Sequence, residues 1–162
     1  MIRPIEINDV DAICEIYNYY ITKTIISFEE RRITVDEMKK RIKSYTSDLP
    51  WIVYEEKGEV VGYAYASPWR SRPAYRYSAE VSVYVSNDKQ GLGIGTKLYR
   101  YLIPMLSNFD IHRIIGGIAL PNEKSVRLHE KMGFNKVAHF TEVGYKFDRW
   151  IDVGYWEFQY DK

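Results

Sequence analysis

Apolar and polar residues alternate along this chain with two different periods, which predict a mixture of helices and strands. Apolar residues at helical spacing, together with capping residues, predict helices over 9–20, 34–45, 95–107 and 122–133. Runs rich in β-branched and aromatic residues predict strands over 2–6, 51–56, 60–67, 78–85, 112–119, 134–145 and 151–160. The stretch 22–33 has no clear period and predicts a loop. The order is therefore β-α-α-β-β-β-α-β-α-β-β, which indicates a mixed α/β domain.

The most informative motif is a glycine-rich turn, Gln90-Gly91-Leu92-Gly93-Ile94-Gly95, between a predicted strand and a predicted helix. Glycines at every second position leave bare N–H groups at a helix N-terminus, where an anion such as phosphate is favoured. A Walker loop would need Gly-Lys before Ser or Thr, but Gly95 is followed by Thr96-Lys97. A Rossmann fingerprint would need its third glycine one position later and normally lies on the first strand. The turn therefore predicts a phosphate site of another kind.

The composition of the chain limits which partners and which location are expected. A chain of 162 residues with 46% hydrophobic and 28% charged residues has the size and composition of one folded domain. A net charge of +1 gives no reason to expect nucleic acid or a membrane surface as partner. The chain shows neither a membrane-length apolar run nor a signal-peptide pattern, and its single cysteine, Cys14, cannot form an internal disulfide. We therefore expect a cytoplasmic protein with a buried thiol. His112 and His139 have no partner at metal-ligand spacing, so no metal is expected.

Several motifs together resemble the GCN5-related N-acetyltransferases (GNAT). Segment 90–95 follows their Gln/Arg-x-x-Gly-x-Gly pattern, and segment 120–134 is similar to their second motif, an Asn and a Ser before a short helix that ends in Gly-Phe. Segments 66–70, 77–86 and 143–156 resemble the phosphinothricin acetyltransferases, whose relatives also acetylate methionine sulfoximine and methionine sulfone. The resemblance implies one acetyltransferase domain over 1–162. It also implies an α/β fold with a mixed central sheet of about six to seven strands and about four flanking helices.

The resemblance also implies acetyl-CoA as cosubstrate. Its pyrophosphate would lie on the glycine-rich turn, and backbone N–H groups of the preceding strand would face the thioester carbonyl. The positions that match the cofactor-binding motifs are Val83, Tyr84, Val85, Gln90, Gly91, Leu92, Gly93, Ile94, Gly95, Thr96, Asn122 and Ser125.

Two residues are candidates for catalysis. An amine attacks only when neutral, so a carboxylate with a raised pKa is a suitable proton acceptor. Glu80 is the one acidic residue in the run 78–85, and it also matches the base of the resembled family. Without that match, a solvated polar face on an edge strand would explain it as well. His129 stands where many family members place a tyrosine. It is a candidate general acid, an orienting donor or a buried core histidine.

The acceptor is expected to be a small amino-acid analogue that reacts through its α-amine. Arg70 and Arg72 can bind carboxylate or phosphinate bidentately, and Tyr75 lies beside them. Phe28 and Glu29 lie in the loop 22–33 and resemble the other substrate-lining segment. Alternatives are an enzyme that acetylates a peptide N-terminus or a polyamine, and a non-catalytic acetyl-CoA sensor. Aromatic residues in the last segments predict a homodimer.

Overall fold

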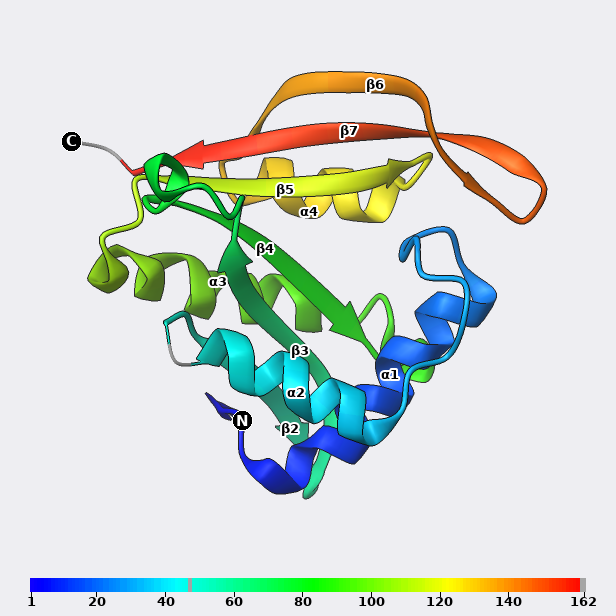
Figure 1. Ribbon diagram of the computed structural model, residues 1–162. Helices are drawn as coiled ribbons and strands as arrows, with labels where there is room; N and C mark the ends of the chain where they lie inside the picture. The colour runs from blue at the N-terminus through cyan, green and yellow to red at the C-terminus, as the bar shows by residue number, and fades with distance from the viewer. Residues whose placement is uncertain (47, 161–162) are drawn as a thin grey trace.

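The computed structural model describes residues 1–46 and 48–160 of the chain. Its strands are β1 (Ile2–Pro4), β2 (Trp51–Glu56), β3 (Glu59–Pro68), β4 (Ser78–Val85), β5 (Arg113–Leu120), β6 (Asn135–Lys146) and β7 (Arg149–Gln159). Its helices are α1 (Val10–Lys23), α2 (Val35–Thr46), α3 (Ile94–Met105) and α4 (Glu123–Lys131). The strands form a 7-stranded sheet in the order β1-β2-β3-β4-β5-β7-β6 (Figure 1). The predicted mixed α/β fold and the predicted order of elements are confirmed.

The sheet divides where β4 meets β5, the one parallel pair among the described strands. Ser78–Glu80 lie opposite Arg113–Ile115, and the two strands then diverge (Figure 1). On its other edge β4 stays paired with β3, from Ala79 opposite Pro68 to Val85 opposite Gly62. After Glu80, the backbone of β4 therefore has an edge that no strand covers.

Helices cover both faces of the sheet. On one face α1 and α2 bury residues such as Ile13, Ile21 and Met38 against β2 and β3. On the other face α3 buries Leu98 and its neighbours against β4. Strand β4 alternates between the two cores, because Val81 packs with α3 whereas Tyr84 packs with α1. Glu80 therefore shares the α1 and α2 face with Tyr84, as the alternation of the sequence predicts.

The predicted helix ends are also largely confirmed. The side-chain oxygen of Thr34 accepts a hydrogen bond of 3.1 Å from the N–H of Glu37, at the start of α2. The Asn122 oxygen accepts a bond of 3.2 Å from the N–H of Ser125, at the start of α4. Gly133 follows α4 at a φ of 91°, a left-handed conformation that favours glycine. Cys14 is buried in the α1 core, as predicted.

Several boundaries differ from the prediction by a few residues; α1, for example, continues to Lys23 and shortens the predicted loop 22–33. Strand β1 ends at Pro4 because the chain turns there: the Asp9 carboxylate accepts a hydrogen bond of 2.7 Å from the N–H of Glu6 and is paired with Arg3. The last hairpin turns at Phe147 and Asp148, which both have positive φ, rather than around 148–150. No glycine or asparagine marks this turn, so no local signal predicts its position.

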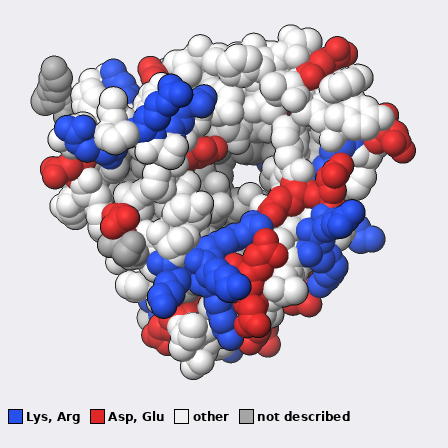
Figure 2. Space-filling model, viewed as in Figure 1, with Lys and Arg blue, Asp and Glu red and all other residues white. Residues whose placement is uncertain are grey.

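The face that carries α1 and α2 is hollowed at its centre. Figure 2 shows acidic and basic side chains mixed over α2 and over the loop before it, next to the hollow. Among the described helices, none combines the length and hydropathy that a membrane span requires. Residues 1–46 and 48–160 also contain no group of three or more His, Cys, Asp and Glu side chains placed to hold a metal ion.

Candidate active site

Glu80 lies at the point where β4 leaves β5. It is the last residue of β4 that is paired with β5, where it lies opposite Ile115. A Cβ added to Gly117 would lie 3.3 Å from Glu80 Oε1, so the carboxylate lies over β5 in space that glycine leaves open. Burial raises the pKa of Glu80, and the positive charge of Arg70 opposes part of that rise. The site thus holds a carboxyl group that is a better proton acceptor than a solvated one.

The open edge of β4 presents alternate backbone groups to the centre of the molecule. The N–H of Ser86 bonds to Val61 O in β3, so Val85 and Val83 present their N–H and C=O groups to the opposite side. At Val85 the hydroxyl of Tyr20 donates to the carbonyl oxygen at 2.6 Å. Val83 is left with its backbone groups directed to the region that β5 has vacated. Val83, Tyr84 and Val85 are the three residues of β4 that match the cofactor-binding motifs. Of these, Tyr84 directs its backbone to β3 and packs its ring on α1.

The glycine-rich turn is formed in the shape that the motif predicts. Gly91 and Gly93 have φ values of 80° and 76°, which side chains rarely adopt, and Gly93 is the N-cap of α3. Gly95 serves close packing, because an added Cβ would lie 3.4 Å from Leu128 of α4. The first turn of α3 contains no acidic residue. The N–H groups of this first turn, including those of Ile94 and Thr96, have no acceptor within the helix. They lie at the positive end of the helix dipole, where no acidic side chain of the same turn neutralises it.

Gln90 joins this turn to two helices. Its Nε2 donates to the Tyr20 hydroxyl at 3.3 Å, and its Oε1 accepts from Lys124 at 3.5 Å. Leu92, by contrast, is exposed at the tip of the turn. Tyr20 therefore connects α1, the end of β4 and the glycine-rich turn, a role that sequence reasoning missed because these contacts span more than 60 residues of chain.

His129 is a buried histidine with both ring nitrogens paired. Its Nδ1 lies 2.8 Å from Ser125 O, which can only accept, so Nδ1 carries the proton. Its Nε2 lies 3.3 Å from the Tyr99 hydroxyl and accepts from it. Burial lowers the pKa of His129, so the ring is neutral. It also lies directly against β5, because a Cβ added to Gly116 would come within 2.5 Å of Nε2. Of the three roles that the sequence left open, this arrangement favours the core histidine.

The loop before β4 brings one of the two predicted arginines to Glu80. Arg70 lies over the ring of Trp69, 5.0 Å from its centroid, and Trp69 packs edge-on against Tyr155 of β7. The positive charge of Arg70 acts to lower the pKa of Glu80 and that of Tyr155. Arg72 and Tyr75 are exposed on the short turn that follows.

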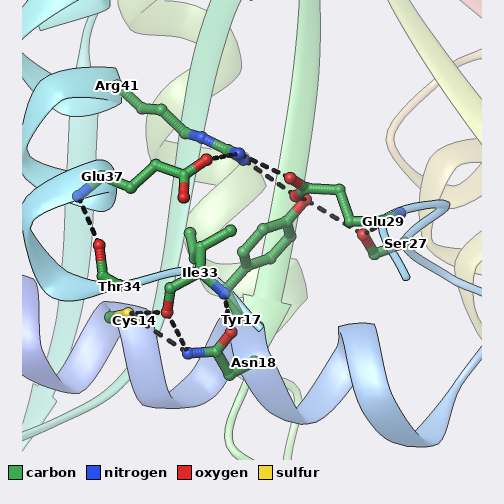
Figure 3. Close-up of polar contacts among 9 residues, drawn as sticks. All are labelled: Cys14, Tyr17, Asn18, Ser27, Glu29, Ile33, Thr34, Glu37 and Arg41. Carbon is green, nitrogen blue, oxygen red and sulfur yellow. Dashed lines mark hydrogen bonds and ion pairs between the residues drawn. The ribbon is translucent and has the colours of Figure 1, made fainter. Parts of the chain in front are cut away.

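The loop between α1 and α2 is held by polar contacts (Figure 3) and by the burial of Ile25 against Ala119 and Ile151. Glu29 accepts from both terminal nitrogens of Arg41, at 2.9 and 2.6 Å, and from the Tyr17 hydroxyl. Asn18 bonds both the N–H and the C=O of Ile33, at 2.9 and 3.0 Å. The Arg41 charge lowers the pKa of Glu29. Glu29 therefore stabilises the loop through an ion pair, whereas Phe28 is half exposed and packs directly on Gly144 of β6.

Lys146 ties this loop to the last hairpin, which sequence reasoning also missed. Its Nζ donates to three backbone oxygens, Ile21 O at 2.7 Å, Thr24 O at 2.8 Å and Ser27 O at 2.6 Å. The side chain is 3% exposed, and burial lowers its pKa. Carbonyl groups at the end of α1 lack helical partners, so the ammonium group satisfies them and the helix dipole together. The one local signal is the position of Lys146 on the inward face of β6.

Comparison with known proteins gives this site a context. The model of the acetyltransferase (GNAT) domain family matches residues 2–154, and the chain belongs to this family. A phosphinothricin N-acetyltransferase of Streptomyces viridochromogenes is 38% identical over 156 residues, which are 96% of this chain and 85% of that protein. An L-methionine sulfoximine/L-methionine sulfone acetyltransferase of Salmonella typhimurium is 37% identical and covers 95% of this chain and 91% of its own length.

Comparison with solved structures also finds acetyltransferases. An acetyltransferase of Salmonella typhimurium, solved with its cofactor acetyl-CoA, has a TM-score of 0.97 and 36% identity, and covers 100% of this chain and 94% of that one. The protein is thus an acyltransferase similar to the phosphinothricin acetyltransferases.

The contacts of Lys146 predict a large cost for removing its charge. Lys146→Met should lower the free energy of unfolding by at least about 2 kcal/mol, because three buried carbonyl groups lose a charged donor. Lys39→Met on the exposed side of α2 is the matched control. Chemical denaturation measures both, and equal stability of the two variants would contradict the structural role of Lys146.

Proposed function

We propose that the protein transfers the acetyl group of acetyl-CoA to the α-amine of a small amino-acid analogue, with Glu80 as the proton acceptor. The observation that carries this proposal is the position of Glu80, a partly buried carboxyl group with a raised pKa beside the open edge of β4. The names of two relatives, which act on phosphinothricin and on methionine sulfoximine or methionine sulfone, support the substrate class.

The residues present fit acetyl-CoA. The N-terminus of α3, with Gly91 and Gly93 in left-handed conformation, suits the pyrophosphate. Leu92 and Gly95 shape this turn, and Gln90 holds it in place. The capped start of α4, with Asn122 and Ser125, forms the opposite wall. When bound, the cosubstrate supplies a thioester that an amine can attack.

Two groups of the chain take part in the reaction, and a third positions them. The Glu80 carboxylate takes the proton of the acceptor's ammonium group, directly or through water, so that a neutral amine attacks the carbonyl carbon. The Val83 N–H donates to the carbonyl oxygen as it gains negative charge. The C–N bond forms and the C–S bond breaks; CoA leaves as a thiolate and takes up, through water, the second proton that the nitrogen loses. His129 acts by position: it holds α4 against Gly116, next to the glycine that makes room for Glu80.

The acceptor lies on the α1 and α2 face, where Glu80 points. Arg70 is the guanidinium beside Glu80 and suits the acceptor's carboxylate, and Arg72 adds a second positive charge on the same loop. Phe28 and Tyr75, which are both exposed, are proposed to contact the aliphatic part of the acceptor.

A homodimer is part of the proposal. Strand β6 is one of the two edge strands of the sheet and is exposed over most of its length. Large apolar side chains lie exposed on β6, on β7 and on the turn between them, namely Val137, Phe140, Val143, Tyr145, Phe147 and Trp150. An edge strand with this surface favours a second copy as its cover.

The cosubstrate site predicts that Gly93→Val loses affinity for acetyl-CoA. The new side chain would stand in the turn that the pyrophosphate approaches. Gly58→Val is the matched control for backbone strain, because Gly58 has a φ of 83° and an added Cβ meets nothing within 4 Å at either glycine. Calorimetric titration should show lost affinity only for Gly93→Val. Unchanged affinity in a folded Gly93→Val protein would contradict the site.

The role of Glu80 predicts a pH profile. Below its pKa Glu80 holds a proton and cannot accept another, so kcat/KM should rise with pH through a value above the usual carboxyl range. Glu80→Gln should remove this acidic limb and lower kcat/KM by about 10² to 10⁴. Glu59→Gln, an exposed glutamate on β3, should keep both. The steady-state rate of CoA release is measured for all three proteins as a function of pH. If the acidic limb of the profile remained in Glu80→Gln, Glu80 would be excluded as the base.

The arginines predict recognition of a carboxylate. Arg70→Ala and Arg72→Ala should lower kcat/KM for methionine sulfone by roughly 100-fold, and much less for its carboxamide. Arg70→Ala should also move the acidic limb to higher pH, because its charge lowers the pKa of Glu80. Arg76→Ala, an exposed arginine of the same loop, is the control. Equal losses on acid and amide would assign both arginines to structure.

A further inference from the structure

Tyr155 of β7 lies beside the proposed base, although no sequence motif pointed to it. In the sheet it lies opposite Gly117 of β5. A Cβ added to Gly117 would lie 3.1 Å from Cε1 of the Tyr155 ring and 3.3 Å from Glu80 Oε1. The ring approaches this point from β7, and the carboxylate approaches it from β4. The two side chains therefore meet in the space that the glycine leaves open.

The direction of the Tyr155 ring follows from its contacts. Cε1, the ring carbon next to the one that bears the hydroxyl, lies closer to the added Cβ of Gly117 than Cδ1 does, at 3.1 against 3.6 Å. Since β5 lies between β7 and β4, the hydroxyl end of the ring is directed toward β4. Trp69 and Phe140 both pack edge-on against the ring, with centroids 5.4 and 5.8 Å away. These two aromatic contacts hold the ring in this direction.

The charges around the Tyr155 hydroxyl agree with this position. Burial raises its pKa, and so does the negative charge of Glu80, whereas the positive charge of Arg70 lowers it. The hydroxyl therefore keeps its proton at neutral pH. Within residues 1–46 and 48–160, no side chain is hydrogen-bonded to it. It is thus a donor that an incoming oxygen can use.

The chemistry of the proposed acceptor decides which oxygen that is. An α-amino acid carries its amine and its carboxylate on the same carbon. With the amine at Glu80, the carboxylate must lie close to Glu80 as well, and it needs donors there because a charge removed from water is costly without partners. Arg70 is one such donor, since its charge acts on both Glu80 and Tyr155.

We propose that Tyr155 is a specificity-determining residue, whose hydroxyl donates a hydrogen bond to the α-carboxylate of the acceptor together with Arg70. Trp69 contacts both donors, because the Arg70 guanidinium lies over its ring at 5.0 Å and Tyr155 packs against it. One side chain thus fixes the two groups relative to each other. The inference rests on the proposed function, since the amine of the same acceptor lies at Glu80.

The test compares kcat/KM for L-methionine sulfone and for 3-(methylsulfonyl)propylamine, the amine that lacks only its carboxylate. Tyr155→Phe keeps the ring and its packing. It should lower kcat/KM for the amino acid by about 10-fold or more, the loss expected for one hydrogen bond to a charged group, and leave that for the amine unchanged. Tyr101→Phe, an exposed tyrosine of α3, should change neither. Where the amine reacts too slowly to follow, its inhibition constant against the amino acid gives the same comparison.

Affinity for acetyl-CoA separates the loss of this contact from a loss of structure. Calorimetric titration should give the same dissociation constant for wild type and Tyr155→Phe. An unchanged kcat/KM for methionine sulfone in Tyr155→Phe, or an equal fall for the amino acid and the amine, would overturn the role of Tyr155. A wild type that acetylates neither methionine sulfone nor phosphinothricin would overturn the proposed function itself.

Discussion

The divergence of β4 from β5 after Glu80 is the constraint on which the rest of the site depends. Parallel strands normally pair along their length, and backbone groups left unpaired inside a protein are costly. Here the pairing covers three residues of each strand and then stops. Tyr20 satisfies the carbonyl group of Val85, and the backbone groups of Val83 face the gap between the two strands. A break in the sheet thus becomes a place where a linear cosubstrate can lie like an additional strand.

The same divergence explains why small residues lie on β5 and rigid contacts surround the gap. Gly117 leaves space for the Glu80 carboxylate, and Gly116 leaves space for His129, which fixes α4. On the face that carries Glu80, Lys146 and the Glu29–Arg41 pair hold the loop 24–33 in place. A site proposed on this face would thus be formed before an acceptor binds, which lowers the entropic cost of binding.

Much of this could be predicted from the sequence, because the signals are local. Helical periods, the caps at Thr34 and Asn122, and the glycine-rich turn each depend on residues a few positions apart. The alternation of β4 placed Glu80 on the correct face. The contacts that refine the site are of the other kind. Lys146 bonds to carbonyls more than 100 residues away, and the environment of His129 exists only once distant elements have packed. Composition and period carry no information on such pairs.

The central claim is that acyl transfer occurs where β4 leaves β5, with the cosubstrate on one side of the sheet and the acceptor on the other. A crystal structure with CoA and methionine sulfone bound together tests this most directly. The account predicts the pyrophosphate on the N–H groups at the start of α3, the CoA sulfur beside the Val83 backbone, and the acceptor amine within hydrogen-bonding reach of Glu80, directly or through one water. CoA bound away from this gap, or an amine remote from Glu80, would contradict it.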